Sequence, residues 1–247
     1  MKIVHIKQKL EEIGITPDNV VLGDFDAIGE FTAKKQRSPD EPNYKKFGAF
    51  FRPNYERGIL VYNLIRQHNL TSFLEIGFGR GYATFCAAKA FHDAGVKGKI
   101  VTIDPNFDQK FIEALHNVFP KEWFDMVTFA KGTSDVVLPK ITDRFDFVYV
   151  DGDHSYEGTK KDWLGVKDKF TSLCLFDDYH MPSKNEPGIQ CARAIDEIDW
   201  KAAGCKEPEL IKLDRRMFLD ERGVSDDDLD YGQVLLTKEG VSLPNDW

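Results

Sequence analysis

The sequence predicts one α/β domain in which helices cover both faces of a mostly parallel, seven-stranded sheet. From residue 73 onward, strand-like runs alternate with helical runs, and this alternation is typical of parallel strands joined by crossover helices. The length of 247 residues and the apolar fraction of 42% suit a single sizeable core. The predicted strands are 73–76, 99–103, 126–130, 145–150, 172–176, 210–213 and 233–237.

Residues 1–70 differ from the remainder and are interpreted as an N-terminal extension of the main domain, which would span 71–247. Residues 1–10 have the pattern of an amphipathic helix start. Residues 23–54 combine glycine, proline, charges and an aromatic cluster with little periodicity, so we expect either a lid over the substrate or a packed loop. A helix with one apolar face is predicted over 53–68.

The most informative segment is 74–81, where a short apolar run ends in a carboxylate and three alternating glycines. The carboxylate is Glu75, and the glycines are Gly77, Gly79 and Gly81. Glycine tolerates positive φ and lets a ligand approach bare backbone, while the following helix directs its positive N-terminal end at that ligand. The pattern therefore predicts a strand, a turn and a helix arranged around a nucleotide-like ligand.

The spacing of the glycines distinguishes two ligand classes. A dinucleotide-binding turn has the order G-x-G-x-x-G, and its third glycine would fall at Tyr82, so a nicotinamide-dependent oxidoreductase is disfavoured. The turn instead resembles the first motif of the class I S-adenosylmethionine-dependent methyltransferases, which have a Rossmann-like fold with seven strands, the last one antiparallel. This resemblance implies that the loop packs on the methionine part of the cofactor. The residues it assigns to cofactor binding are Glu75, Gly77, Phe78, Gly79 and Gly81.

Two further segments are expected to complete the cofactor site. Asp104 ends the second predicted strand, where an acid can accept hydrogen bonds from both hydroxyls of a ribose, although it could instead cap the helix that begins near Phe107. After the third strand, Thr133 and Ser134 combine hydroxyls with a turn, and methyltransferases that resemble this segment place adenine near it. Helix capping by Thr133 or Ser134 is the alternative.

Two neighbouring strands are followed by acidic residues. The strand 145–150 leads into Asp151, and the strand 172–176 leads into Asp177 and Asp178. Carboxylates brought close together repel one another and raise each other's pKa, whereas a divalent cation removes the conflict and prefers oxygen ligands. We therefore predict Mg²⁺ or a similar ion held by these three aspartates, against the alternative that they lie in solvated turns.

The segments 151–158 and 176–179 resemble a bacterial family that includes macrocin- and aminocoumarin-type sugar O-methyltransferases. The resemblance spans about residues 72–180. It implies the same metal ligands, places Asp151 beside the cofactor as well, and assigns general-base chemistry to Asp153. Helix capping is the alternative role for Asp153.

Methyl transfer from a sulfonium is an in-line displacement that needs a nucleophile without its proton. Either Asp153 or His154 could take that proton, and a metal ion would lower the pKa of the acceptor. The prediction is therefore metal-assisted O-methylation of a small molecule or sugar. A metal-independent methyltransferase that uses Asp153 or His154 alone and a noncatalytic cofactor-binding or assembly module are the alternatives.

Composition disfavours several other partners. The net charge is −8 and no lysine- or arginine-rich block occurs, so nucleic acid is an unlikely partner. No apolar stretch approaches the roughly 20 residues that cross a bilayer, and no signal peptide is recognised, so we expect no membrane association and a cytoplasmic location. Four scattered cysteines suit buried thiols in a reducing compartment. A homo-oligomer remains open, and the acidic segment 220–231 is interpreted as a solvated turn.

Overall fold

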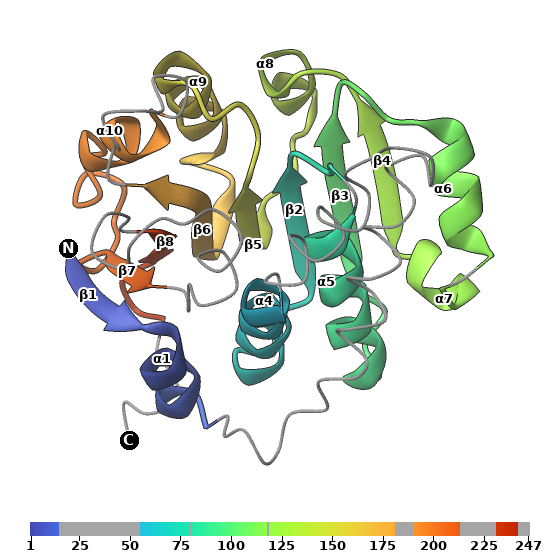
Figure 1. Ribbon diagram of the computed structural model, residues 1–247, viewed down its shortest axis with the longest axis horizontal. Coiled ribbons are helices and arrows are strands. Elements are labelled where there is room, and N and C mark those ends of the chain that lie inside the picture. Colours follow the sequence, from blue (N-terminus) through green and yellow to red (C-terminus); the bar gives the residue numbers. More distant parts are fainter. Residues whose placement is uncertain (15–54, 80, 118, 181–189, 213–230, 242–247) are drawn as a thin grey trace, which may run out of the picture.

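The computed structural model describes residues 1–14, 55–79, 81–117, 119–180, 190–212 and 231–241. These residues form one eight-stranded sheet in the order β1-β7-β8-β6-β5-β2-β3-β4, with helices on both faces (Figure 1). In the described residues, no helix is long and apolar enough to cross a membrane. The predicted lid over 23–54 and most of the acidic segment 220–231 lie outside the described residues.

The strands and helices have the following bounds. The strands are β1 Lys2–His5, β2 Ser72–Ile76, β3 Lys99–Asp104, β4 Val127–Lys131, β5 Phe145–Val150, β6 Phe170–His180, β7 Glu209–Lys212 and β8 Tyr231–Thr237. The helices are α1 Ile6–Glu12, α4 Tyr55–Gln67, α5 Tyr82–Asp93, α6 Gln109–His116, α7 Lys121–Phe124, α8 Ser134–Val137, η3 Leu138–Lys140, α9 Tyr156–Val166 and α10 Cys191–Asp196.

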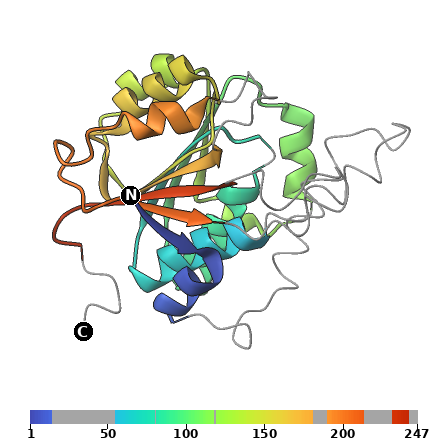
Figure 2. The ribbon, with the colours of Figure 1, turned by 60° about the vertical axis from the view of Figure 1, so that its left-hand side comes forward.

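The predicted fold class is confirmed, and all seven predicted strands are present. Strand β8 runs antiparallel to both of its neighbours, β6 and β7, while the other pairs are parallel. Side chains alternate across the sheet, as in β5, where Phe147 and Tyr149 pack toward one core and Val148 and Val150 toward the other. Figure 2 shows α9 and α10 on one face of the sheet and α1, α4 and α5 on the other.

The eighth strand corrects the prediction for residues 1–10. Instead of starting a helix at once, the chain forms β1, which pairs in parallel with β7, and only then enters α1. Pairing with β7 holds these residues in the extended conformation, and of the four only Val4 is buried. The buried ammonium of Lys9 on α1 donates to the Glu209 carboxylate of β7, which fixes α1 against this edge of the sheet.

Candidate active site

The glycine turn after β2 lies against the end of β5. The Gly77 N–H donates to the carbonyl of Ile103 at 2.8 Å, and the Asp151 N–H donates to the carbonyl of Ile76 at 2.8 Å. Gly77 has φ +89°, and a Cβ built there would lie 2.5 Å from the carbonyl carbon of Asp151 and closer still to its oxygen. Both the conformation and the close approach therefore require glycine at this position.

The remainder of the glycine turn packs on a cluster of aromatic side chains. Gly79 and Gly81 have φ +50° and +81°, and Gly81 immediately precedes α5. The Phe78 side chain is buried, with ring centroids 5.2 Å from Phe107 and 5.5 Å from Phe129. Phe78 thus anchors the turn in the core, and its backbone rather than its ring borders the space where the cofactor is expected.

Glu75 is buried beneath the turn. Its carboxylate accepts hydrogen bonds from the hydroxyl of Thr102 on β3 at 2.6 Å and from the hydroxyl of Thr84 on α5. Burial raises the pKa of Glu75 to about 7, although these hydrogen bonds act in the opposite direction. The side chain joins β2, β3 and α5, so in this structure it holds the turn in place from below.

Asp104 lies at the rim of the turn, as predicted for a ribose-binding acid. Its Oδ2 accepts from the Gly79 N–H at 3.0 Å, and its Oδ1 accepts from the Asn106 N–H at 2.7 Å. Asp104 does not cap the next helix, because the carboxylate at the start of α6 is that of Asp108, which accepts from the Lys110 N–H at 2.9 Å. The Asp104 carboxylate is therefore not the cap of α6, and its role in ribose binding stays a prediction.

Thr133 and Ser134 follow β4. Thr133 occupies the N-cap position of α8, although its side chain makes no capping hydrogen bond, and the Ser134 hydroxyl donates to the carboxylate of Asp162 on α9. Asp162 is buried, and burial raises its pKa to about 6. Sequence analysis missed Asp162, since a single aspartate in a helical stretch carries no local signal of burial.

Asp177 and Asp178 share an arginine that sequence analysis also missed. The Nη1 atom of Arg57 lies 2.7 Å from Asp177 Oδ2, and its Nη2 lies 2.9 Å from Asp178 Oδ1. Asp177 also accepts from the Tyr149 hydroxyl at 2.6 Å and from the Asp178 N–H at 2.8 Å. Gly58 lets α4 approach α5 closely, because a Cβ there would lie 2.5 Å from the Tyr82 hydroxyl.

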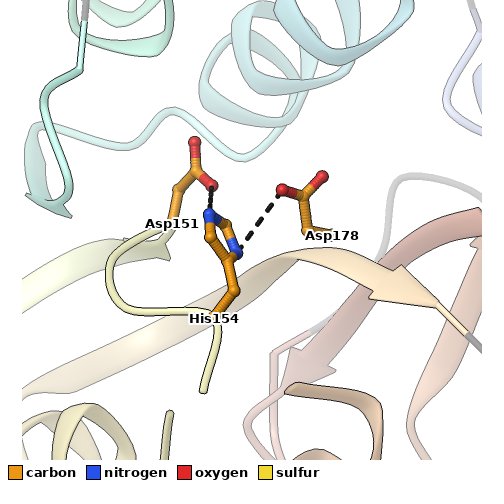
Figure 3. A group of neighbouring side chains, drawn as sticks. All are labelled: Asp151, His154 and Asp178. Atoms are coloured by element: carbon orange, nitrogen blue, oxygen red, sulfur yellow. Dashed lines mark ion pairs between the residues drawn. The ribbon is translucent and has the colours of Figure 1, made fainter. Parts of the chain in front are cut away.

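Figure 3 shows the imidazole of His154 between the carboxylates of Asp151 and Asp178. Its Nδ1 lies 3.4 Å from Asp178 Oδ2, and its Nε2 lies 3.9 Å from Asp151 Oδ1. One ligand atom from each of these three residues lies within 4.8 Å of the other two. This grouping differs from the predicted metal ligands, because His154 takes the place of Asp177.

Asp153 lies beside this group at the start of α9. Its Oδ1 accepts from the Ser155 N–H at 2.9 Å, and a Cβ on Gly158 would collide with its carboxyl group. Ser155 is the N-cap of α9, since its hydroxyl accepts from the Gly158 N–H at 3.0 Å. Asp153 is therefore an exposed carboxylate that orders the loop into α9 and is not the helix cap itself.

The acidic edge carries excess negative charge. Burial, followed by the charges of Asp177 and Asp178, raises the pKa of Asp151 well above its usual value. Burial also raises the pKa of Asp177, while the charge of Arg57 opposes this. Three aspartates face one guanidinium, so the group can accommodate further positive charge or a proton.

Comparisons with known proteins agree with this architecture. Residues 74–179 match a family model described as a methyltransferase domain. The O-methyltransferase TomG from Streptomyces achromogenes, in complex with S-adenosylmethionine, is 18% identical, with a TM-score of 0.53 and coverage of 89% of this chain and 99% of TomG. No curated protein matches the sequence.

Two further structures have the same fold. The Podospora anserina methyltransferase PaMTH1, bound to S-adenosylhomocysteine (SAH), is 17% identical, with a TM-score of 0.53 and coverage of 90% of this chain and 97% of its own. An O-methyltransferase from Bacillus cereus, in complex with SAH, is 14% identical, with a TM-score of 0.54 and coverage of 88% and 100%. The chain therefore has the Rossmann-like α/β fold of the methyltransferases.

Proposed function

We propose that the protein is an S-adenosylmethionine-dependent methyltransferase that methylates an oxygen of a small molecule or sugar. The observation that carries this proposal is the glycine turn between β2 and α5. The Gly79 N–H of this turn donates a hydrogen bond to Asp104 at the carboxyl edge of the sheet. Ligands of open parallel sheets bind at this edge. The turn lies within the segment that matches a methyltransferase domain, and TomG, which shares the fold, binds S-adenosylmethionine.

We assign a separate group of the chain to each part of the cofactor. Asp104 would accept hydrogen bonds from the ribose hydroxyls, and the backbone of the glycine turn would border the methionine part. Thr133 and Ser134 would lie near the adenine, and Asp151 would flank the site from the end of β5. S-adenosylmethionine, when bound, would supply a methyl group whose carbon the acceptor oxygen attacks in line with the C–S bond, and that bond would break to release SAH.

We assign the role of general base, which takes the proton of the substrate hydroxyl, to Asp153, with His154 as the alternative. Asp153 is exposed on the loop after β5, so its carboxylate is accessible to a substrate at the carboxyl edge. His154 faces Asp151 and Asp178, with its Nε2 3.9 Å from Asp151 Oδ1 and its Nδ1 3.4 Å from Asp178 Oδ2. Both residues share one loop, and substitution of each in turn distinguishes them.

Metal assistance is the finer part of the proposal. The fit is supported by the close grouping of Asp151, His154 and Asp178 and by the excess negative charge of the edge. A divalent cation bound there, for which sequence analysis predicts Mg²⁺, would lower the pKa of an acceptor hydroxyl and fix its position. Arg57 favours the metal-independent alternative as a second candidate, because its guanidinium already neutralises part of this edge.

Isothermal titration with SAH, run with and without Mg²⁺, tests the proposal before the acceptor is known. We expect binding in the micromolar range, and heat from Mg²⁺ alone would support the metal step. Binding of SAH with chelator-insensitive turnover would favour the metal-independent candidate. Absence of SAH binding under both conditions would refute the methyltransferase assignment and favour the dinucleotide or assembly alternatives.

A further inference from the structure

We propose that Asp162 determines which purine base the cofactor site accepts, because it holds the hydroxyl of Ser134 in one orientation. Asp162 lies on α9 and would not touch the cofactor, so it is a positioning residue that acts through Ser134. The inference deepens the proposed function and rests on its placement of adenine near Ser134. It also gives a role to a buried carboxylate that lies outside both the glycine turn and the acidic edge.

Ser134 follows the strand next to the one that ends in Asp104. Strand β4 pairs in parallel with β3, and Lys131 at the end of β4 lies opposite Asp104. The Gly132 N–H then donates to the carbonyl of Asp104 at 3.1 Å. Ser134 comes two residues later, at the carboxyl edge where ligands of parallel sheets bind. This neighbourhood supports a contact between Ser134 and a base attached to the ribose that Asp104 is proposed to bind.

Asp162 contacts Ser134 from the interior of the protein. Only 3% of Asp162 is exposed, whereas Ser134 is partly exposed. The Ser134 hydroxyl donates to Oδ1 of Asp162. The other carboxylate oxygen, Oδ2, faces the loop after β5, where a Cβ built on Gly152 would lie 2.7 Å from it. Asp162 is thus held between the loops that follow β4 and β5, and Ser134 lies between this carboxylate and the surface.

The contact with Asp162 fixes the polarity of the Ser134 hydroxyl. A serine hydroxyl has one hydrogen to donate and two lone pairs that accept. Burial raises the pKa of Asp162 to about 6, so at about pH 8 its carboxyl group is ionised and can only accept. The single hydrogen of Ser134 is therefore committed to Asp162, and the oxygen offers only lone pairs to a ligand.

An acceptor in this place distinguishes purine bases by the group at their C6 position. Adenine carries an amino group there, which can donate to Ser134. Hypoxanthine carries a carbonyl oxygen, which would face the lone pairs of Ser134 without a hydrogen between them, and such an unpaired contact weakens binding. Without Asp162, the hydroxyl could rotate and donate to that carbonyl, so selection for adenine would be lost although Ser134 remains.

Asp135 is the competing acceptor for an amino group, because it follows Ser134 directly. Its side chain is exposed, and a hydrogen bond with the Thr133 side chain lowers the pKa of its carboxyl group. An exposed carboxylate can exchange a ligand for water at little cost, so it should discriminate less between the two bases than a hydroxyl held from the interior.

The test titrates the full chain at about pH 8 with SAH and with S-inosylhomocysteine, in which hypoxanthine replaces adenine. The variants are Ser134→Ala, Asp162→Leu and the two combined, with Asp135→Asn as the matched control for an exposed neighbouring acid. Leucine carries two methyl groups where aspartate carries two oxygens, so Asp162→Leu removes the acceptor with little change in shape. The quantity compared is the ratio of the two dissociation constants.

We expect the parent to bind SAH at least about tenfold more tightly than S-inosylhomocysteine. Asp162→Leu should weaken SAH binding and strengthen S-inosylhomocysteine binding, so that this preference falls at least about fivefold, whereas a purely structural role would weaken both ligands alike. Ser134→Ala should also lower the preference. Asp162→Leu added to Ser134→Ala should then change it less than about twofold, because the carboxylate acts through the hydroxyl. Asp135→Asn alone should likewise change it less than about twofold.

An unchanged preference in Asp162→Leu would overturn the inference, and a preference that falls only in Asp135→Asn would make Asp135 the acceptor. If Asp162→Leu does not fold, Asp162→Asn decides instead, because its amide can donate to Ser134. The preference should then fall at least about threefold, and an unchanged value would overturn the inference. Equal binding of both ligands by the parent would overturn only this inference, whereas absence of SAH binding by the parent would refute the proposed function and this inference with it.

Discussion

Replacement of Gly77 by alanine tests the close approach of the glycine turn to β5. An alanine at φ +89° costs about 1 to 2 kcal/mol of backbone strain. Its Cβ would also overlap the Asp151 carbonyl, so the turn must move away from β5. That movement strains or breaks two backbone hydrogen bonds, those between Gly77 and Ile103 and between Asp151 and Ile76, each contributing about 1 kcal/mol. We therefore expect Gly77→Ala to lower the free energy of unfolding by about 3 to 4 kcal/mol.

Gly79→Ala is the matched control two residues away. Gly79 has φ +50°, but a Cβ there meets no described atom within 4 Å. Only the strain of about 1 kcal/mol applies, so the variant should fold nearly as well as the parent. Its methyl group would nevertheless project from the turn into the space proposed for the cofactor, and SAH affinity should fall at least about tenfold, or about 1.4 kcal/mol.

Urea unfolding measures the first effect, and titration with SAH measures the second. The two variants should separate, with Gly77→Ala affecting mainly stability and Gly79→Ala affecting mainly binding. Equal unfolding free energies for the two variants would show that the turn does not press against β5. Unchanged SAH affinity in Gly79→Ala would show that the cofactor does not lie against this glycine.

Three further predictions concern single carboxylates and the histidine. Asp104→Ala should weaken SAH binding by about 1 to 3 kcal/mol, because the ribose hydroxyls lose their acceptor, and an unchanged dissociation constant by calorimetry would rule out the ribose role. Because burial raises the pKa of Asp162 to about 6, the folded state binds more protons than the unfolded state between about pH 4 and 6, so stability falls as pH rises through this range. Between about pH 4 and 6 the parent should lose about 2 to 3 kcal/mol of its free energy of unfolding, and Asp162→Asn should not show this loss. Parallel pH profiles of urea unfolding for variant and parent would contradict this. Once an acceptor is found, Asp153→Asn should lower kcat at least about 100-fold with little change in SAH affinity, because the general base is lost. If His154→Gln loses more kcat than Asp153→Asn and still binds Mn²⁺ normally, His154 is the base instead.

The sheet could be predicted from sequence because its signals are local. Strands such as 145–150 consist mainly of β-branched and aromatic residues, and the glycines at 77, 79 and 81 identify the first turn by their spacing. Strand β1 was missed because its four residues are too few to separate period two from helical periodicity, and its pairing partner lies about 200 residues away.

The contact of Asp104 with the glycine turn was easier to predict than the contacts at the acidic edge. Asp104 lies where the order of strands requires it, and its contact with Gly79 follows from that order. Arg57 reaches the acidic edge only through the packing of α4 on α5, and no local pattern encodes such a contact. The left-handed backbone of Asp178, with φ +52°, likewise accompanies a shift in register between β6 and β8, which the order of residues along β6 does not reveal.

The pairing of β1 with β7 has a practical consequence for anyone who shortens this protein. A chain that begins at residue 71 would retain every residue of the glycine turn and the acidic edge other than Arg57. It would also strip the hydrogen-bonded neighbour from β7 and remove Lys9 from the Glu209 carboxylate. A strand edge with unpaired backbone N–H and C=O groups can pair with strands of other chains, so we expect the fragment to aggregate. The first fourteen residues thus supply the neighbouring strand and helix at this end of the sheet and should be kept in any shortened form of the protein.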